Sequence, residues 1–201
     1  MKTFIAINTV SDIFSISLFL NGEFKDSIEI KEMHSHTKFL ADNFDKILLH
    51  NNLSIDSLDF IAIVIGPGSF SGIKAGVNFV KGICFAVSIP VIPINQFESF
   101  NNQIVNNQKY YVALFSHRDN IYYQLYESGL PKESAKCGHY TNLDSQIKVY
   151  GYMLDKINDF DYELINISSK ADGEFALKKC SSLLIDNANN LVPIYLNKIQ
   201  D

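Results

Sequence analysis

Residues 60–87 constrain the fold more than any other part of the chain. Six consecutive apolar residues, 60–65, are followed by a glycine-rich stretch at 66–72 and by a long apolar segment that ends near Val87. An uninterrupted apolar run of this length is typical of a central strand that is covered on both faces. A strand, a glycine loop and a helix in this order also build many phosphate sites. We therefore expect an α/β protein with mixed sheets flanked by helices.

The glycine loop matches none of the common nucleotide or nucleophile motifs. It lacks the Gly-Lys-Ser/Thr ending of a Walker A loop, and one extra residue precedes Gly72 compared with a GxGxxG dinucleotide loop. Neither Ser69 nor Ser71 has the two flanking glycines of a nucleophile elbow. The residues alone leave an anion cradle and a tight strand-to-helix turn open, and they favour the turn.

The segment that follows the loop, 70–87, predicts a helix with apolar residues on more than one side. One stripe consists of Ile73, Val77, Val80, Cys84 and Val87, and a neighbouring flank carries Gly72, Gly76, Phe79 and Ile83. The two glycines cost about 1 kcal/mol each in helix propensity, which close packing must offset. We expect another helix to approach this flank.

Alternating apolar residues predict further elements on both sides of this segment. In the first half we expect strands at 4–7, 14–20 and 23–31, which form an antiparallel meander, and a helix at 36–50. In the second half we expect a short strand at 91–92, a helix within 95–108, a hairpin at 110–126, a helix at 146–157, a strand at 162–168 and a helix at 175–184. The asparagine-rich stretch at 95–108 suggests two domains, 1–104 and 105–201, with the last residues packing back on the first lobe.

Charge and composition narrow the class of protein. The formal net charge of −5 argues against binding to nucleic acid without a partner. The amino terminus lacks a secretory apolar region, and we expect no membrane-spanning segment. Cys84, Cys137 and Cys180 show neither metal-type nor redox-type spacing. These features predict a reduced, cytoplasmic protein whose cysteines are small buried residues.

The histidines offer one candidate metal site. His34 and His36, with Glu32 nearby, are two residues apart and would face the same way only in an extended segment. A role in capping and solvating the start of the helix at 36–50 is the favoured interpretation. His50, His117 and His139 have no acidic or cysteine partner nearby in the sequence.

Four segments together resemble the TsaB (YeaZ) family. They are residues 5–19, His34-Ser35-His36, the loop GPGSFSGIKAG at 66–76, and Pro193-Ile-Tyr-Leu196. The resemblance implies an actin-like ATPase (ASKHA, ribonuclease H-like) fold with two lobes. It also implies a non-catalytic role in forming N6-threonylcarbamoyladenosine at position 37 of ANN-decoding tRNAs, together with the paralogous transferase TsaD and the ATPase TsaE.

The resemblance also identifies residues that depart from the catalytic paralogue. TsaD carries a His-x-x-x-His metal pair, and by register those positions are Gln96 and Phe100 in this chain. A phenyl ring has no donor lone pair, so this metal site is expected to be absent. The first-strand turn of the family usually reads Asp-Thr-Ser, whereas this chain has Asn8-Thr9-Val10, and Asn197 replaces a terminal arginine. A neutral Asn8 disfavours nucleotide hydrolysis.

Two sets of site residues follow from the resemblance. The partner or dimer interface is expected on two helices, through Phe39, Leu40, Phe44, Gly72, Ile73, Gly76, Val77 and Val80. A vestigial nucleotide site would use Asn8, Thr9, Gly66, Pro67, Gly68, Ser69, Phe70, Ser71 and Gly72. We expect no catalytic residue, no metal and no tightly bound cofactor in this chain, and we expect ATP and metal on the partner proteins.

The expected partners are a TsaD-like paralogue, a TsaE-like ATPase, tRNA only through the complex, and a second copy when the chain is isolated. Two alternatives stay open at this point. One is a small ASKHA-fold ATPase or kinase that uses the glycine loop for phosphate. The other is a metallopeptidase, against which Gln96 and Phe100 argue.

Overall fold

The computed structural model describes residues 2–31, 36–157 and 160–196, and it describes no side chain at 36–38. The chain forms two compact units. The first comprises the residues up to Gln96 together with Ser168–Ile194, and the second comprises Phe97–Ile167 and the residues from Tyr195 on. This division differs from the predicted one at residue 104. The reason is that the last helix, α4 (Ser169–Leu183), contributes Phe175 and Ala176 to the core of the first unit.

The first unit is built on a five-stranded sheet. Its strand order is β3 (Glu23–Lys31), β2 (Ile13–Leu20), β1 (Phe4–Asn8), β4 (Phe60–Gly66) and β5 (Val91–Asn95). The first three strands form the predicted antiparallel meander, and β4 and β5 continue the sheet parallel to β1. The meander and the central strand are confirmed.

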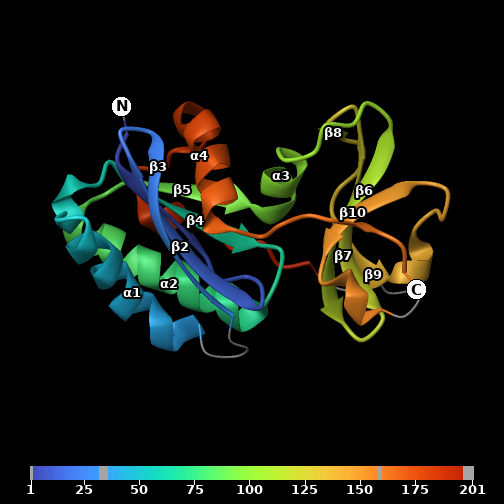
Figure 1. The fold of residues 1–201 in the computed structure, drawn as a ribbon, viewed down its shortest axis with the longest axis horizontal. Helices are drawn as coiled ribbons and strands as arrows, with labels where there is room; N and C mark the ends of the chain where they lie inside the picture. Colours follow the sequence, from blue (N-terminus) through green and yellow to red (C-terminus); the bar gives the residue numbers. More distant parts are fainter. Residues whose placement is uncertain (1, 32–35, 158–159, 197–201) are drawn as a thin grey trace. The chain divides into compact units, whose positions relative to one another are not determined.

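Helices cover both faces of this sheet (Figure 1). α1 (His36–His50) and α2 (Phe70–Val87) lie on one face, and α4 lies on the other. Every residue of β1 and β4 is buried, as the apolar run at 60–65 predicted. On one face the ring of Phe4 stacks on Phe19 at 4.6 Å and on Phe60 at 4.4 Å between centroids, which ties the meander to the central strand.

α2 has the length and composition of a membrane span, contrary to the expectation from its sequence. Its mean hydropathy is 1.3, and 33% of its residues are buried inside the protein. A helix that packs on the core of a globular unit passes the same test. α2 contacts β4 and α1 within the first unit, so its apolar character has a local explanation.

The second unit contains a six-stranded sheet. The order is β11 (Glu163–Leu164), β10 (Lys148–Tyr152), β6 (Lys109–His117), β7 (Asn120–Glu127) and β8 (Leu130–Pro131), and β9 (Lys136–His139) also pairs with β7. β6 alternates between two apolar clusters. Tyr110 and Val112 face one, which includes two phenylalanines of α3 (Gln96–Asn101), and Tyr111 and Ala113 face the other. The predicted hairpin at 110–126 is confirmed.

One prediction for the second half of the chain is wrong, and two others are wrong only in their bounds. Residues 148–152, expected in a helix, form β10, because Val149 and Gly151 are buried where the strand pairs with β6. The helix expected at 175–184 begins at Ser169, after the Ser168 side chain accepts a hydrogen bond from the Ala171 amide at 3.2 Å. Of the strand expected at 162–168, only two residues form β11. Short 3-10 turns complete the fold: η1 (Ile55–Ser57), η2 (Tyr140–Asn142), η3 (Leu154–Lys156) and η4 (Ala188–Asn190).

Candidate functional site

The carboxyl ends of the parallel strands define the candidate site. β1, β4 and β5 end at Asn8, Gly66 and Asn95, and the glycine loop leaves the sheet at this edge. In open α/β sheets, ligands bind outside the carboxyl ends of the strands. The edge therefore brings together the two sequence features that predicted a vestigial nucleotide site, namely the first-strand turn and the loop at 66–72.

The glycine loop packs directly against the turn that follows β1. The Ser69 amide donates to the Val10 carbonyl at 2.8 Å, and the Thr9 hydroxyl donates to the Gly72 carbonyl at 2.8 Å. A Cβ atom at Gly68 would lie 2.4 Å from the Val10 carbonyl oxygen, and one at Gly72 would lie 1.9 Å from that of Thr9. Both positions therefore require glycine because the main chain of the β1 turn lies against them. This geometry favours the tight turn over the anion cradle.

Beside the loop, three buried polar side chains bond to one another. Asn8, Gln96 and Asp172 are 0%, 1% and 1% exposed. The side-chain amide of Asn8 donates to Gln96 Oε1 at 2.8 Å and to Asp172 Oδ2 at 2.7 Å. The side-chain amide of Gln96 donates to Asp172 Oδ1 at 3.4 Å. We call these three residues the amide–carboxylate network.

The amide–carboxylate network explains how a carboxylate is accommodated at this edge. Asp172 lies in the first turn of α4, where the helix dipole favours negative charge, and amide N–H groups of Asn8 and Gln96 point at its two oxygens. Sequence analysis missed Asp172 because it placed the start of this helix at residue 175. Ser168 as a helix cap, four residues before an acidic residue, was the signal that could have located it.

The metal site of the catalytic paralogue does not fit these residues. Gln96 uses its oxygen and its amide within the network. Phe100 is fully buried in an apolar cluster of the second unit and offers no ligand atom. Within residues 2–31, 36–157 and 160–196, no group of three or more His, Cys, Asp or Glu residues gathers. His34 and Glu32 lie outside the described residues, as does the side chain of His36.

The residues expected to form a partner interface face the core instead. Leu40, Phe44, Ile73, Val77 and Val80 are each at most 2% exposed, Gly72 and Gly76 are buried, and Phe39 is half-buried. The apolar stripe of α2 packs on β4, so it is not available to another chain. A Cβ at Gly76 would lie 2.5 Å from the Thr9 hydroxyl oxygen, which means that this glycine accommodates the β1 turn and not a partner helix.

A neighbouring side of α2 does present large apolar side chains to solvent. Phe70 is 64% exposed and Phe85 is 82% exposed, with Lys74 and Asn78 exposed between them. At 100° per residue these four side chains fall on one face, which we call the exposed α2 face. The exposed aromatic rings make this face a candidate interaction surface. Sequence analysis missed Phe85 because the stronger apolar stripe of the helix points inward.

Cys84 provides a test of how tightly α2 packs. It is 4% exposed, and burial raises the pKa of its thiol from 9.0 to about 11. At pH 8 its thiolate fraction is therefore about a hundredfold lower than that of an exposed cysteine. We expect iodoacetamide to alkylate Cys84 at least about a hundredfold more slowly in the folded protein than in urea. Mass spectrometry resolves this site from the half-buried Cys180, and equal rates with and without urea at Cys84 would contradict the packing.

Two mixed sheets, the first of which continues an antiparallel meander with parallel strands and carries helices on both faces, define the class as the actin-like ATPase fold. The solved structure described as YeaZ from Pseudomonas aeruginosa superposes with a TM-score of 0.76 at 17% identity, covering 98% of this chain and all of that one. The ethanolamine utilization protein EutJ from Carboxydothermus hydrogenoformans superposes with a TM-score of 0.55 at 8% identity, covering 87% and 89%. These likenesses show the fold.

Sequence comparison identifies the family. The family model of TsaD, tRNA N6-adenosine threonylcarbamoyltransferase, matches residues 31–172. The tRNA threonylcarbamoyladenosine biosynthesis protein TsaB of Haemophilus influenzae is 34% identical over 93 residues, and that of Buchnera aphidicola is 33% identical over 110 residues. The chain belongs to the TsaD family, and within it to the TsaB (YeaZ) group. These matches cover 46% and 54% of this chain and span 39% and 49% of the two curated relatives.

Proposed function

We propose that this chain is a non-catalytic subunit required for N6-threonylcarbamoyladenosine formation at position 37 of ANN-decoding tRNAs. In this proposal it binds a TsaD-like transferase and acts together with a TsaE-like ATPase. The TsaB relatives support a role in this tRNA modification, since both are named tRNA threonylcarbamoyladenosine biosynthesis proteins. Catalysis, ATP and metal would then reside on the partner proteins.

The observation that carries the non-catalytic role is the closure of the amide–carboxylate network. The side chains of Asn8, Gln96 and Asp172 are buried and bond to one another, and Asn8 Oδ1 also accepts a hydrogen bond from the Val10 amide. The glycine loop next to them is bonded to the β1 turn. An edge whose polar groups are already paired would have to break these bonds before it could hold a phosphate or a cation.

The exposed α2 face supports the binding of a protein partner. Phe70 and Phe85 supply apolar area, and Lys74 lies between them. Interfaces between proteins are enriched in such aromatic side chains. With a formal net charge of −5, the chain is a poor independent ligand for tRNA, so we propose that tRNA contacts it only through the complex. A cytoplasmic location follows from this role.

Phe85→Asp tests this surface. We expect the substitution to weaken binding to a co-expressed TsaD homologue by about tenfold or more, because a buried carboxylate would replace an apolar anchor. Affinity is measured by calorimetry, and threonylcarbamoyladenosine is measured by mass spectrometry of tRNA from a deletion strain that carries the variant. Modification is expected to fall with the affinity.

Leu130→Asp is the matched control, because Leu130 is an apolar side chain that is 68% exposed and belongs to the second unit, whereas α2 belongs to the first. It should leave both the affinity and the modification unchanged. Equal binding by the Phe85 and Leu130 variants would exclude the exposed α2 face. Full modification in a strain without this protein would overturn the proposed function itself.

In isolation we expect the same face to pair two copies of this chain, so that Phe85→Asp also converts a homodimer into a monomer in light scattering. The ATPase or kinase alternative makes a different prediction. ATP turnover by the isolated chain, abolished by a substitution at Gly68, would support that alternative and contradict a non-catalytic role.

A further inference from the structure

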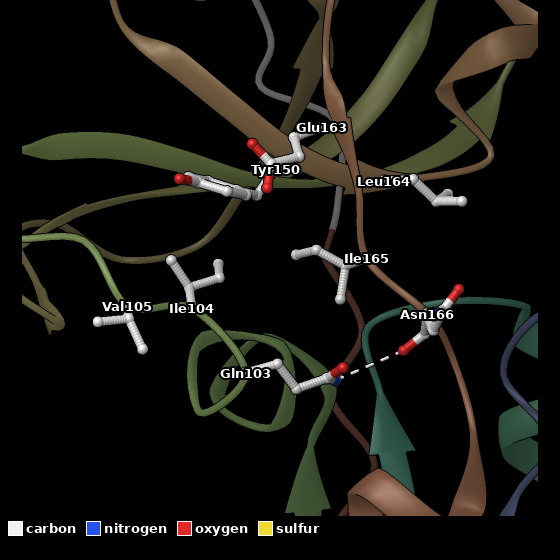
Figure 2. A pocket seen from close by; sticks show the side chains of 8 residues that line it. All are labelled: Gln103, Ile104, Val105, Tyr150, Glu163, Leu164, Ile165 and Asn166. Carbon is white, nitrogen blue, oxygen red and sulfur yellow. Dashed lines mark hydrogen bonds between the residues drawn. The ribbon is translucent and has the colours of Figure 1, made fainter.

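The outer edges of the two sheets are covered to different extents. β5, at one end of the first sheet, is covered by Ile185, whose amide and carbonyl exchange hydrogen bonds with Val91 at 2.8 and 2.9 Å. Just beyond β11, at an edge of the second sheet, the side-chain amide of Gln103 donates to the Asn166 carbonyl at 3.4 Å (Figure 2). β3 ends the first sheet on its other side, is nine residues long, and pairs on that side with no strand of the described residues. Such an edge can pair with another chain unless something blocks it.

Asp26 blocks the centre of the β3 edge. The main-chain amide of Ser27 donates to Asp26 Oδ1 at 2.8 Å, so this amide points away from β2. Because alternate residues of an antiparallel strand bond to the neighbouring strand, Glu29 and Lys31 also direct their main-chain groups to the open side. An added strand would need the Ser27 amide and would have to displace the Asp26 carboxylate.

The end of α1 holds this carboxylate in place. The side-chain amide of Asn51 donates to Asp26 Oδ2 at 2.9 Å and to the Ile47 carbonyl at 2.8 Å. Both oxygens of Asp26 therefore have a partner, one in β3 itself and one fixed on the last turn of α1. A bulge at Lys25, the residue of β3 that has no partner in β2, bends the same edge. Bulges and charged side chains are means by which natural proteins keep an open edge from pairing.

The charged side chains on either side of Asp26 and Ser27 alternate in sign and are exposed. They are Glu23, Lys25, Glu29 and Lys31. In the described part of the chain, Lys31 alone among these four forms an ion pair, with Asp12 at 3.9 Å, and its side chain is still 77% exposed. The other three charges are available to a partner.

The order of these charges makes β3 complementary to a second copy of itself. An antiparallel pairing of two β3 strands centred on Ser27 places Glu23 opposite Lys31, and it places Lys25 opposite Glu29. Because such a pairing is two-fold symmetric, each opposite-charge pair occurs twice. A centre one residue later sets Lys25 against Lys31, and a centre one residue earlier sets Glu23 against Glu29. Since like charges directly opposite each other destabilise a pair of strands, the charge pattern selects the register centred on Ser27.

We propose that β3 is a latent contact between two copies of this chain and that Asp26 keeps it closed. While the carboxylate holds the Ser27 amide, the edge does not pair. Once the carboxylate is released, Ser27 of each copy bonds to Ser27 of the other through the main chain, and the opposite-charge pairs fix the register. The two first sheets then form one continuous sheet. The inference rests neither on the function proposed above nor on the exposed α2 face.

Release of the carboxylate is tested on the full chain that carries Phe85→Asp, which keeps pairing through the exposed α2 face out of the measurement. In sedimentation velocity we expect Asp26→Ala in this background to raise the association constant about tenfold or more, because two Ser27 amides per dimer become free to bond. Asn51→Ala keeps the carboxylate but removes the group that holds it, and it should raise association in the same direction. Asp45→Ala, which removes an exposed aspartate of α1, is the matched control and should have no effect. The proposal is wrong if neither Asp26→Ala nor Asn51→Ala raises association, or if Asp45→Ala raises it equally.

Charge reversal separates pairing in this register from general stickiness of the released edge. Glu29→Lys, added to the Asp26→Ala chain, sets a lysine of one copy against Lys25 of the other and should abolish the gain in association. A further Lys25→Glu restores opposite charges with their signs exchanged, and it should restore the gain. A loss that the second reversal does not repair would contradict the register.

Cysteine cross-linking locates the centre of the pairing directly. Under mild oxidation of the Asp26→Ala chain, Ser27→Cys should form a disulfide with its own copy, because directly opposite residues lie within the Cα distance that a disulfide spans. Glu29→Cys should not, because the two copies of residue 29 are four positions apart in this register, about 13–14 Å along the strands. Cross-linking of Glu29→Cys as fast as that of Ser27→Cys, or of neither variant, would overturn the proposal.

Discussion

Alanine at Gly72 is expected to lower the free energy of unfolding by about 3 kcal/mol or more, or to prevent folding of the first unit. The added Cβ would lie 1.9 Å from the carbonyl oxygen of Thr9 and 3.0 Å from its carbonyl carbon. Both atoms belong to the main chain at the end of β1, a strand that is hydrogen-bonded on both sides. Neither β1 nor α2 can move away without breaking its packing on the sheet.

Gly82→Ala is the matched control for this substitution, because Gly82 lies in the same helix and nothing approaches its Cβ position within 4 Å. Alanine there should stabilise the protein by about 0.5–1 kcal/mol through helix propensity. Urea unfolding monitored by circular dichroism measures both variants. If Gly72→Ala unfolded at the same urea concentration as the wild type, the close contact between the loop and the β1 turn would be refuted.

Aspartate at position 8 is expected to cost about 3–5 kcal/mol at neutral pH, the range measured for an uncompensated buried charge. In the wild type, the side-chain amide of Asn8 donates to the Asp172 carboxylate at 2.7 Å. In the variant, a second carboxylate would stand at this distance in a site with no exposure. The loss should shrink as the pH falls, because protonation of one carboxylate restores a hydrogen-bond donor between the two.

The reciprocal exchange provides the control. In the double variant Asn8→Asp, Asp172→Asn, one carboxylate and one amide again face each other, so most of the lost stability should return at pH 7. Thermal melts of the single and double variants between pH 5 and pH 8 measure the effect. A stable Asn8→Asp variant whose melting is independent of pH would contradict the amide–carboxylate network.

The parts of the fold that could be predicted are those whose sequence pattern reflects local structure. The meander alternates with a period of two, and the run at 60–65 is too short and too apolar for an exposed helix. β10 was missed for a different reason. Its Val149 and Gly151 are buried through parallel pairing with β6, a strand more than thirty residues earlier in the chain. Local periodicity carries no information about such a partner.

The same distinction applies to the candidate site. Asn8 and Gln96 could be identified because they replace residues that the family usually carries there. The Ser168 cap could have placed Asp172 in the first turn of a helix but not beside Asn8, because the two residues are 164 apart in sequence and meet only when α4 packs on the first sheet. The interface prediction named residues of α1 and α2 that the structure largely buries. The stripe with the most apolar residues is the one that this chain buries.

The first unit is built from two separated segments of the chain, so the order of synthesis decides when it can be completed. Its last hydrogen bond to the central strand is donated by the Ile194 amide to the Ile65 carbonyl at 2.8 Å, and α4 supplies Asp172 shortly before. Since both segments follow residues 97–167 of the second unit in the chain, the nascent first sheet lacks one of its covering helices until α4 has been synthesised. The carboxyl edge of that sheet is completed only after Asp172 and Ile194 have been added, so a product that terminates before α4 cannot display it.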